Sequence, residues 1–201
     1  MKTAAALSIV KHGSPALLLM DFQGFVLDNF LSPATARDVV GRARQLLDAA
    51  RLAALPVIHV TVAFRRGYPE IDPHNALFSR LKESGLVTPG SEGIRIHADL
   101  TPLDTEAVVV KHRVGPFIGT DLDLLLRAGG IRTLILAGVT TAGAVLSTAR
   151  HAFDLDYTLA VAADGCADPD EEIHMLLIDK VLPQHATVSA TEDIARALQT
   201  S

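Results

Sequence analysis

Short runs of apolar residues alternate along this chain with longer stretches in which apolar residues recur every three or four positions. The short runs are apolar on both faces, which is typical of strands in a parallel sheet that helices cover on both sides. The pattern predicts strands at residues 16–20, 56–62, 107–110, 133–137 and 158–162, and a shorter one at 186–189.

The stretches between these runs have the period of an amphipathic helix. Within residues 35–54, for example, Val39, Ala43, Leu46 and Ala50 recur at helical spacing. Helices are predicted at 35–54, 121–128, 141–153, 169–182 and 191–198, where glycine, proline and capping residues mark several of the ends. Residues 63–104 are irregular, with one candidate helix at 76–83, and are compatible with either a binding loop or a plain surface excursion.

This alternation of strands and helices predicts the α/β fold class, as a three-layer α/β/α doubly wound sheet with right-handed crossovers. We expect six mainly parallel strands in the order 3-2-1-4-5-6, a common order in such sheets. No repeat or low-complexity linker divides the chain, so residues 1–201 are expected to form a single domain.

Composition narrows the classes of partner. The formal net charge is −5 and no run of Lys or Arg is long, so we expect neither nucleic acid nor a membrane as a partner. The apolar start at residues 1–10 is interrupted by Lys11 and is too short for a signal peptide. The single cysteine, Cys166, excludes an internal disulfide and suits a reducing compartment, so a cytoplasmic location is expected.

Two charged residues follow predicted strands, at the sheet edge where ligands bind in open α/β folds. Asp21 comes directly after the first strand and Lys111 after the third. Burial raises the pKa of an aspartate and a nearby cation lowers it, so an Asp21 under both influences could hold a proton near neutral pH. Lys111 could orient this acid or stabilise developing negative charge. Each residue is also compatible with a structural role, Asp21 as a loop cap and Lys111 as a lysine that reaches water.

A turn of small residues, Gly-Val-Thr-Thr-Ala-Gly-Ala at 138–144, follows the fourth predicted strand. Small residues let a ligand approach the backbone, and the first N–H groups of the next helix have no partners within that helix. Together with the helix dipole these groups could bind an anion or a developing oxyanion. The same small residues would also serve close packing of the helix on the sheet.

In this order, the three features resemble the isochorismatase-like (cysteine hydrolase) family, and the resemblance extends from about residue 15 to residue 188. Further matching segments are Asp-Phe-Gln at 21–23, Phe117 with Gly-Thr-Asp-Leu at 119–122, Gly-Val-Thr-Thr at 138–141, Ser-Thr-Ala-Arg at 147–150 and Ala-Asp-Gly-Cys-Ala-Asp at 163–168. The resemblance places the Asp, Lys and Cys triad of the family at Asp21, Lys111 and Ala144, so this member lacks the nucleophilic cysteine. It also implies a cis peptide bond between Val139 and Thr140.

Ala144 changes the chemistry that the resemblance implies, because a methyl group cannot attack a carbonyl. Some members of the family cleave a vinyl ether without a thiol. We therefore expect a small-molecule hydrolase in which Asp21 is the general acid/base, assisted by Lys111. A vinyl ether such as isochorismate is the candidate substrate. The expected substrate-binding residues are Gln23, Arg65, Phe117, Val139, Thr140 and Gly143, with backbone amides near Ala144 binding an oxygen.

Two other interpretations remain open. The chain is also compatible with a catalytically silent homologue that binds a small molecule, or with a cysteine amidohydrolase whose nucleophile was mutated to Ala144. No metal is expected, because the spacing of Asp72 and His74 resembles a metal site of some relatives but no further histidine follows until His97. No cofactor is expected, since the chain has no phosphate-binding loop or dinucleotide fingerprint. The resemblance implies a homodimer or homotetramer.

Overall fold

A single parallel sheet organises the computed structural model, which describes residues 14–199. Its six strands lie in the order β3-β2-β1-β4-β5-β6, and every neighbouring pair is parallel. The predicted fold class and strand order are confirmed. The apolar start considered above, at residues 1–10, lies outside the described residues.

The strands agree with the apolar runs of the sequence and differ mainly at their ends. They are β1 (Pro15–Met20), β2 (Val57–Val62), β3 (Ala107–Lys111), β4 (Thr133–Val139), β5 (Thr158–Ala167) and β6 (Thr187–Ser189). The largest difference is β5, which continues five residues beyond the predicted end at Ala162. An irregularity in register between Leu136 and Gly138 lets the end of β5 pair with the end of β4, Gly138 opposite Cys166.

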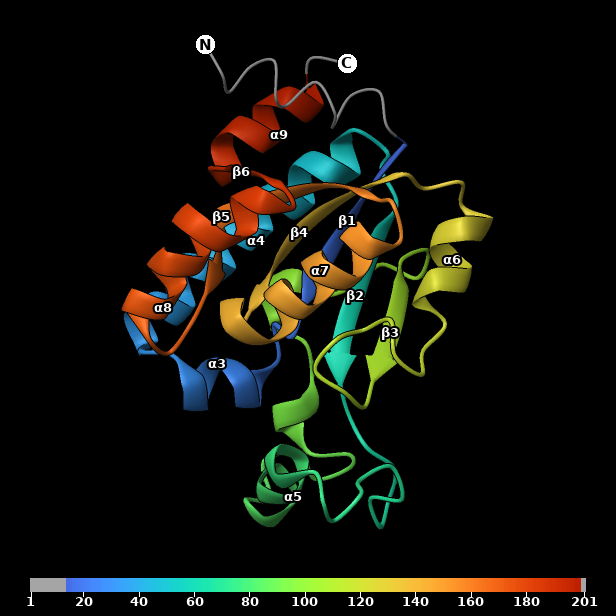
Figure 1. The fold of residues 1–201 in the computed structure, drawn as a ribbon, viewed down its shortest axis with the longest axis vertical. Helices are drawn as coiled ribbons and strands as arrows, with labels where there is room; N and C mark the ends of the chain where they lie inside the picture. The colour runs from blue at the N-terminus through green and yellow to red at the C-terminus, as the bar shows by residue number, and fades with distance from the viewer. Residues whose placement is uncertain (1–13, 200–201) are drawn as a thin grey trace.

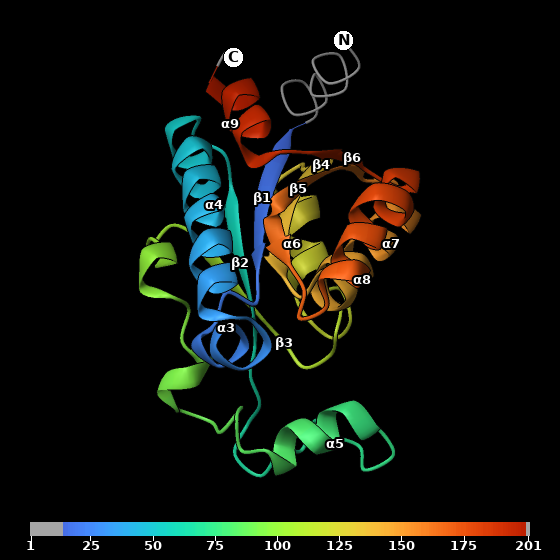
Figure 2. The same ribbon diagram turned by 90° about the vertical axis from the view of Figure 1, so that its left-hand side faces the viewer.

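Helices cover both faces of the sheet, as Figure 2 shows edge-on. One face carries α3 (Gly24–Phe30), α4 (Pro33–Leu52) and α9 (Thr191–Gln199), and the other carries α6 (Leu122–Ala128), α7 (Leu146–Asp154) and α8 (Glu171–Leu176). The sequence did not predict α3, which is short and has no side-chain cap at its start. The predicted helix at 169–182 is divided into α8, a π-helical turn η4 (Leu177–Val181) and a 3-10 turn η5 (Leu182–Gln184).

Each face of the sheet has its own hydrophobic core, because successive residues of a strand point to opposite faces. Leu17 and Leu19 of β1 pack into the core beneath α4, whereas Leu18 and Met20 pack into the core beneath α7. All four side chains are buried. Because both faces of a central parallel strand are buried, the strand is apolar at every position, and this pattern is what predicted the parallel sheet from the sequence.

The irregular segment between β2 and β3 extends beyond the carboxyl ends of the strands (Figure 1). It contains α5 (Ala76–Glu83), at the bounds predicted from the sequence, and the 3-10 turns η1 (Glu92–Ile94) and η2 (Ala98–Leu100). Phe78 of α5 is buried and its ring meets that of Phe64, at 5.9 Å between centroids. The segment is therefore packed against the carboxyl end of the sheet by aromatic contacts.

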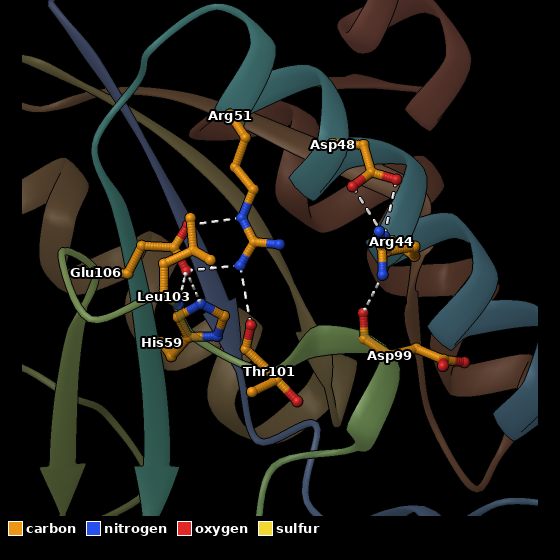
Figure 3. A network of polar contacts seen from close by, with 8 residues as sticks. All are labelled: Arg44, Asp48, Arg51, His59, Asp99, Thr101, Leu103 and Glu106. Carbon is orange, nitrogen blue, oxygen red and sulfur yellow. Dashed lines mark hydrogen bonds and ion pairs between the residues drawn. The ribbon is translucent and has the colours of Figure 1, made fainter.

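A buried polar cluster fastens α4 to the sheet (Figure 3). Glu106, just before β3, accepts hydrogen bonds from Arg51 Nε at 2.7 Å and Arg51 Nη2 at 2.8 Å, and its Oε2 lies 3.0 Å from His59 Nε2. Burial alone would raise the pKa of Glu106, but these contacts and the N–H of Leu103 lower it to about 2. Burial lowers the pKa of His59, which favours its neutral ring.

Candidate active site

Asp21 stands at the point where β1 leaves the sheet. Its backbone N–H still donates to Val60 on β2, at 2.8 Å, and its φ of 58° turns the chain sharply out of the strand. Aspartate tolerates this left-handed conformation better than most residues with a side chain. The residue is buried, with 6% of its surface exposed, so its carboxyl group is fixed at the carboxyl edge of the sheet.

Lys111 reaches Asp21 across the end of the strand between them. It is the last residue of β3, opposite Val62 of β2 in the register of the sheet. Its Nζ lies 2.7 Å from Oδ2 of Asp21 and donates to the carbonyl of Arg113 at 3.3 Å. A lysine side chain is long enough to bridge one intervening strand, so the two residues meet although β1 and β3 are not neighbours.

The electrostatics of Asp21 favour a carboxyl group that can hold a proton. Burial raises its pKa, while the charge and hydrogen bond of Lys111 oppose that rise, and the net pKa is above the ordinary value. Its second oxygen, Oδ1, is buried and has no hydrogen-bond partner among residues 14–199. A buried acid with one paired and one unpaired oxygen is suited to exchanging a proton with a ligand.

The turn after β4 brings Ala144 to the same place. The peptide bond between Val139 and Thr140 is cis, at the position that the family resemblance implies. A π-helical turn, η3 (Thr141–Val145), follows and leads into α7. Ala144 is buried in this turn. Short π-helical segments occur often at functional sites.

Two glycines of the turn are required by close packing. A Cβ on Gly138 would lie 2.8 Å from the Cβ and the carbonyl oxygen of Met20, where β4 approaches β1. A Cβ on Gly143 would lie 2.7 Å from Oγ1 of Thr140. This hydroxyl accepts the N–H of Gly143 at 3.0 Å, so it cannot withdraw without loss of a hydrogen bond.

Two polar residues beyond the turn hold it in place, and the sequence did not point to either role. Asp168 accepts the N–H of Ala142 on Oδ2 at 2.8 Å, and His174 Nδ1 lies 2.8 Å from Oγ1 of Thr141. The N–H groups of Ala142 and Gly143 are therefore already bonded within the protein. This corrects the expectation that the amides at the start of the helix are generally open to a ligand, since two of them are capped by side chains.

Around these groups lies a cavity of about 160 Å³, called here the Asp21 pocket. Its walls are mainly apolar, and its charged lining residues are Asp21, Lys111 and Arg113. The lining residues are Asp21, Phe25, Val26, Phe30, Val62, Leu77, Phe78, Leu81, Lys111, Arg113, Val114, Val139, Thr140, Gly143 and Ala144. Because α5 supplies three of them, the segment between β2 and β3 forms a wall of the pocket.

Six of the nine predicted site residues line this pocket together: Asp21, Lys111, Val139, Thr140, Gly143 and Ala144. Gln23, Arg65 and Phe117 are not among its lining residues, so their role as substrate contacts stays a prediction that this pocket does not support. Each of the three has other partners that account for its position.

Gln23 is fully buried and joins β1 to β2 and the following loop. Its amide nitrogen donates to the carbonyls of Val62, at 3.0 Å, and Ile94, at 2.6 Å, and its oxygen accepts the N–H of Val62 at 2.8 Å. Arg65 pairs with Glu70 at 2.7 Å and its side chain is 74% exposed. Phe117 stacks on the ring of His151, at 4.8 Å between centroids, on the α7 side of the sheet.

Arg113 lines the Asp21 pocket and was missed in the sequence. It lies two residues after Lys111, in the segment Lys-His-Arg, and this proximity was the one available signal. Its Nη1 donates to the carbonyls of Glu70, at 3.1 Å, and His112, at 2.6 Å, and its guanidinium lies 5.8 Å from the ring centroid of Phe78.

Cys166 lies next to this site and not within it. It lines a separate cavity of about 290 Å³, whose wall includes Phe30, Asp168 and His174 and which shares Phe30 with the Asp21 pocket. Burial raises the pKa of its thiol to about 12, so the sulfur is protonated at neutral pH. A protonated, buried thiol is a packing group and a poor nucleophile.

Residues 14–199 contain neither a clustered metal-ligand set nor a membrane-spanning helix. No cluster of three or more His, Cys, Asp or Glu side chains in this part of the chain is placed to hold a metal ion, and Asp72 contacts only His74 of the two candidate histidines. No helix there combines the length and apolar character needed to cross a bilayer.

Known proteins are similar to this chain in both sequence and fold. The model of the isochorismatase domain matches residues 15–193. The isochorismatase family protein YecD of Escherichia coli is 35% identical over 184 residues, which cover 91% of this chain and 95% of the relative. The ureidoacrylate amidohydrolase RutB of Stutzerimonas stutzeri is 33% identical over 176 residues, covering 78% of this chain and 71% of the relative.

A solved structure gives the same result in three dimensions. The N-carbamoylsarcosine amidase from Thermoplasma acidophilum superposes on this chain with a TM-score of 0.71 and 29% sequence identity. The superposition covers 89% of this chain and 96% of the amidase.

Proposed function

This chain belongs to the isochorismatase family of hydrolases, and from this premise we propose that it hydrolyses a small enol ether by proton transfer from Asp21, without a thiol nucleophile. The family resemblance places the sulfur of amide-cleaving relatives at the position of Ala144, whose methyl group cannot form a covalent intermediate. The remaining chemistry has to come from groups that transfer protons or stabilise charge.

One observation carries this proposal. Oδ2 of Asp21 is held by Lys111 at 2.7 Å, while Oδ1 is buried without a partner in the described chain and the residue lines the pocket. The raised pKa of Asp21 lets it hold a proton closer to neutral pH than an exposed aspartate can. Lys111 limits that rise, so the acid can also release its proton.

The proposed reaction is R–O–C(=CH₂)–R′ + H₂O → R–OH + CH₃–CO–R′. Asp21 donates its proton to the CH₂ carbon, and the electron pair of the double bond forms the new C–H bond. Water adds to the resulting oxocarbenium ion and returns a proton to Asp21. The hemiketal then breaks its C–O bond to the alcohol, with a proton passing to the leaving oxygen.

Lys111 and the turn at Val139–Ala144 have supporting roles in this proposal. The ammonium group of Lys111 orients Asp21 and stabilises its carboxylate after the proton has left. Ala144 leaves room where a sulfur would stand, and a water molecule in that space could add to the cation. Asp168 and Thr140 keep the turn in one conformation through their bonds to Ala142 and Gly143.

Turnover of enol ethers tests this proposal. The protein is incubated with isochorismate, with α-alkoxyacrylates and with neutral alkyl vinyl ethers, and the carbonyl product, a ketone or an aldehyde, is followed by NMR. We expect turnover of at least one class and a loss of about 10²–10⁴-fold in kcat for Asp21→Asn, which removes the acid. The matched control is Asp104→Asn, because Asp104 is exposed and does not line the pocket. Absence of turnover, or equal activity of the Asp21→Asn variant, contradicts the proposal.

The relatives favour a second candidate, a cysteine amidohydrolase in which the nucleophile has been replaced by Ala144. One relative is a ureidoacrylate amidohydrolase and one structural neighbour is an N-carbamoylsarcosine amidase. In this case Ala144→Cys would create hydrolysis of a carbamoyl amide that the unchanged chain lacks. A homologue that only binds a small molecule would show neither activity in either form.

Two wider expectations belong to the same proposal. We propose a homodimer or homotetramer, which sedimentation equilibrium would reveal, and a cytoplasmic location, for which the single cysteine is the basis. A monomer at micromolar concentration would contradict the first.

A further inference from the structure

The charges that line the Asp21 pocket do not cancel. Its charged lining residues are Asp21, Lys111 and Arg113. Asp21 and Lys111 form an ion pair at 2.7 Å and neutralise one another. Within the described part of the chain, Arg113 contacts carbonyl oxygens and an aromatic ring but no carboxylate at ion-pair distance. The pocket therefore carries one excess positive charge when Asp21 is ionised, and two when it is protonated.

Arg113 is held in place by groups that leave most of its donors unused. Both of its hydrogen bonds, to the carbonyls of Glu70 and His112, come from Nη1. A guanidinium has five N–H donors in a planar fork. Nε and Nη2 make no hydrogen bond with residues 14–199, so the fork can bind a carboxylate through two parallel bonds. The contact with Phe78 at 5.8 Å fixes the plane of the group beside the pocket.

The rest of the wall is mainly apolar, which favours a ligand whose remaining part is apolar. Aromatic and aliphatic side chains from α3 and α5 surround the space, namely Phe25, Val26, Phe30, Leu77, Phe78 and Leu81. A cavity of about 160 Å³ accommodates a compact molecule of roughly ten heavy atoms. A ligand that matches both features has one carboxylate and an otherwise apolar body.

We propose that Arg113 is the specificity-determining residue of this pocket and binds the carboxylate of a small, monoanionic substrate whose apolar body lies against Phe25 and Phe78. The role that the sequence suggested for Arg65 is thus taken by Arg113. As a statement about the substrate it rests on the proposed function, but as a statement about binding it does not, because binding can be measured without turnover.

The binding test compares two probes of equal shape. Benzoate carries the carboxylate and benzamide is its neutral counterpart, and both have nine heavy atoms. Their dissociation constants are measured by calorimetry for the unchanged protein, Arg113→Gln, Arg113→Lys and Arg65→Gln. We expect Arg113→Gln to weaken benzoate binding by about tenfold to a hundredfold and benzamide binding by less than about twofold.

The control variants separate charge from shape. Arg65→Gln removes a neighbouring arginine that is exposed and paired with Glu70, so benzoate binding should not change. Arg113→Lys keeps the charge but loses the planar fork, so an intermediate loss is expected. Equal losses for both probes in Arg113→Gln would mean that Arg113 only supports α5, and no loss for benzoate, or no benzoate binding to the unchanged protein, would overturn the proposal.

The thermal midpoint of each variant is recorded alongside. If Arg113→Gln does not fold, the proposal is tested with Arg113→Lys and with the salt dependence of benzoate binding to the unchanged protein. Benzoate binding that changes neither with Arg113→Lys nor with salt overturns the proposal. Benzoate selectivity that depends on Arg113, in a protein that turns over no enol ether, would refute the proposed reaction and leave this inference standing. Turnover of neutral vinyl ethers in preference to α-alkoxyacrylates would overturn this inference and leave the proposed reaction standing.

Discussion

Lys111 Nζ lies 2.7 Å from Asp21 Oδ2, although β2 separates the strands that carry the two residues. Both side chains are buried, at 4% and 9% exposure, so the pair is shielded from water. Removing one partner of such a buried pair lowers the stability of the fold more than replacing both partners by uncharged residues, because the remaining charge is left uncompensated. The stability of the protein therefore depends on the two residues jointly.

A double-mutant cycle at this pair should show strong coupling. We expect Lys111→Met to lower the free energy of unfolding at pH 8 by about 3–5 kcal/mol, and Asp21→Asn/Lys111→Met to lower it by less than the single change. Urea denaturation measures the free energy of unfolding of the unchanged protein, the two single variants and the double variant. Additive effects of the two substitutions would show that the pair is not coupled.

The pH dependence of Lys111→Met follows from the raised pKa of Asp21. Without the ammonium group this pKa rises further, because burial is then unopposed. An acid whose pKa is higher in the folded state than in the unfolded state destabilises the fold as pH rises above the unfolded pKa, near 3.9. Lys111→Met should thus lose more stability at pH 8 than at pH 5, while Asp21→Asn/Lys111→Met should lack this trend.

Glu106 should support the acid stability of the fold. Its pKa is about 2 in the folded state, below the 4.5 of an unpaired glutamate, so its contribution is complete above pH 4.5 and is lost as pH falls towards 2. The full shift would correspond to about 3 kcal/mol at neutral pH, and because solvent screens this partly exposed group we expect a contribution of about 1–2 kcal/mol. We expect Glu106→Gln to destabilise the protein at pH 7 and to lose less stability than the unchanged chain on acidification.

The control for Glu106 lies in a separate group of polar contacts on the same helix as Arg51 (Figure 3). Asp48 pairs with Arg44 on the surface of α4, with about half of each side chain exposed. Exposed pairs contribute little to stability. Asp48→Asn should therefore leave the acid unfolding curve unchanged, and an effect equal to that of Glu106→Gln would contradict the assignment to the buried cluster.

Gly143 should tolerate no side chain while Thr140 is present. Gly143→Ala places a Cβ 2.7 Å from Oγ1 of Thr140, and overpacking of this kind costs about 1–3 kcal/mol. Thr140→Ala removes that oxygen, so Gly143→Ala should cost less in its background. Gly41→Ala, in α4 with nothing within 4 Å of the new Cβ, should instead stabilise the protein by about 0.5–1 kcal/mol. Thermal unfolding followed by circular dichroism compares the four variants.

The reactivity of thiols should distinguish position 144 from position 166. Burial raises the pKa of Cys166 to about 12, so the folded protein should resist iodoacetamide at pH 7.5 and react only after denaturation. Ala144→Cys places a thiol in the Asp21 pocket, which Lys111 also lines, and mass spectrometry should show one rapid modification of the folded variant. Cys166→Ala provides the background. Fast alkylation of the unchanged protein would show that Cys166 is accessible after all.

The site was predictable where it depends on the carboxyl ends of strands, and less so where it depends on side-chain direction. Asp21, Lys111 and Ala144 lie at or after the carboxyl ends of strands in a parallel sheet, so their meeting at one edge follows from topology. The sequence does not show which arginine points inwards. Arg65 is turned away by Glu70, and Arg113 is held at the pocket by carbonyl groups of distant residues.

By itself, the sequence determined the parallel α/β sheet, its layers and the sheet edge that carries Asp21 and Lys111, because burial on both faces forces an apolar period that can be read along the chain. Only the tertiary structure decided which groups have their hydrogen bonds satisfied. It uses Gln23 to join strands, caps the amides of Ala142 and Gly143 with side chains, and leaves Oδ1 of Asp21 without a partner in the described chain. Such pairings depend on contacts between segments far apart in the chain, so the local periodicity of the sequence does not predict them.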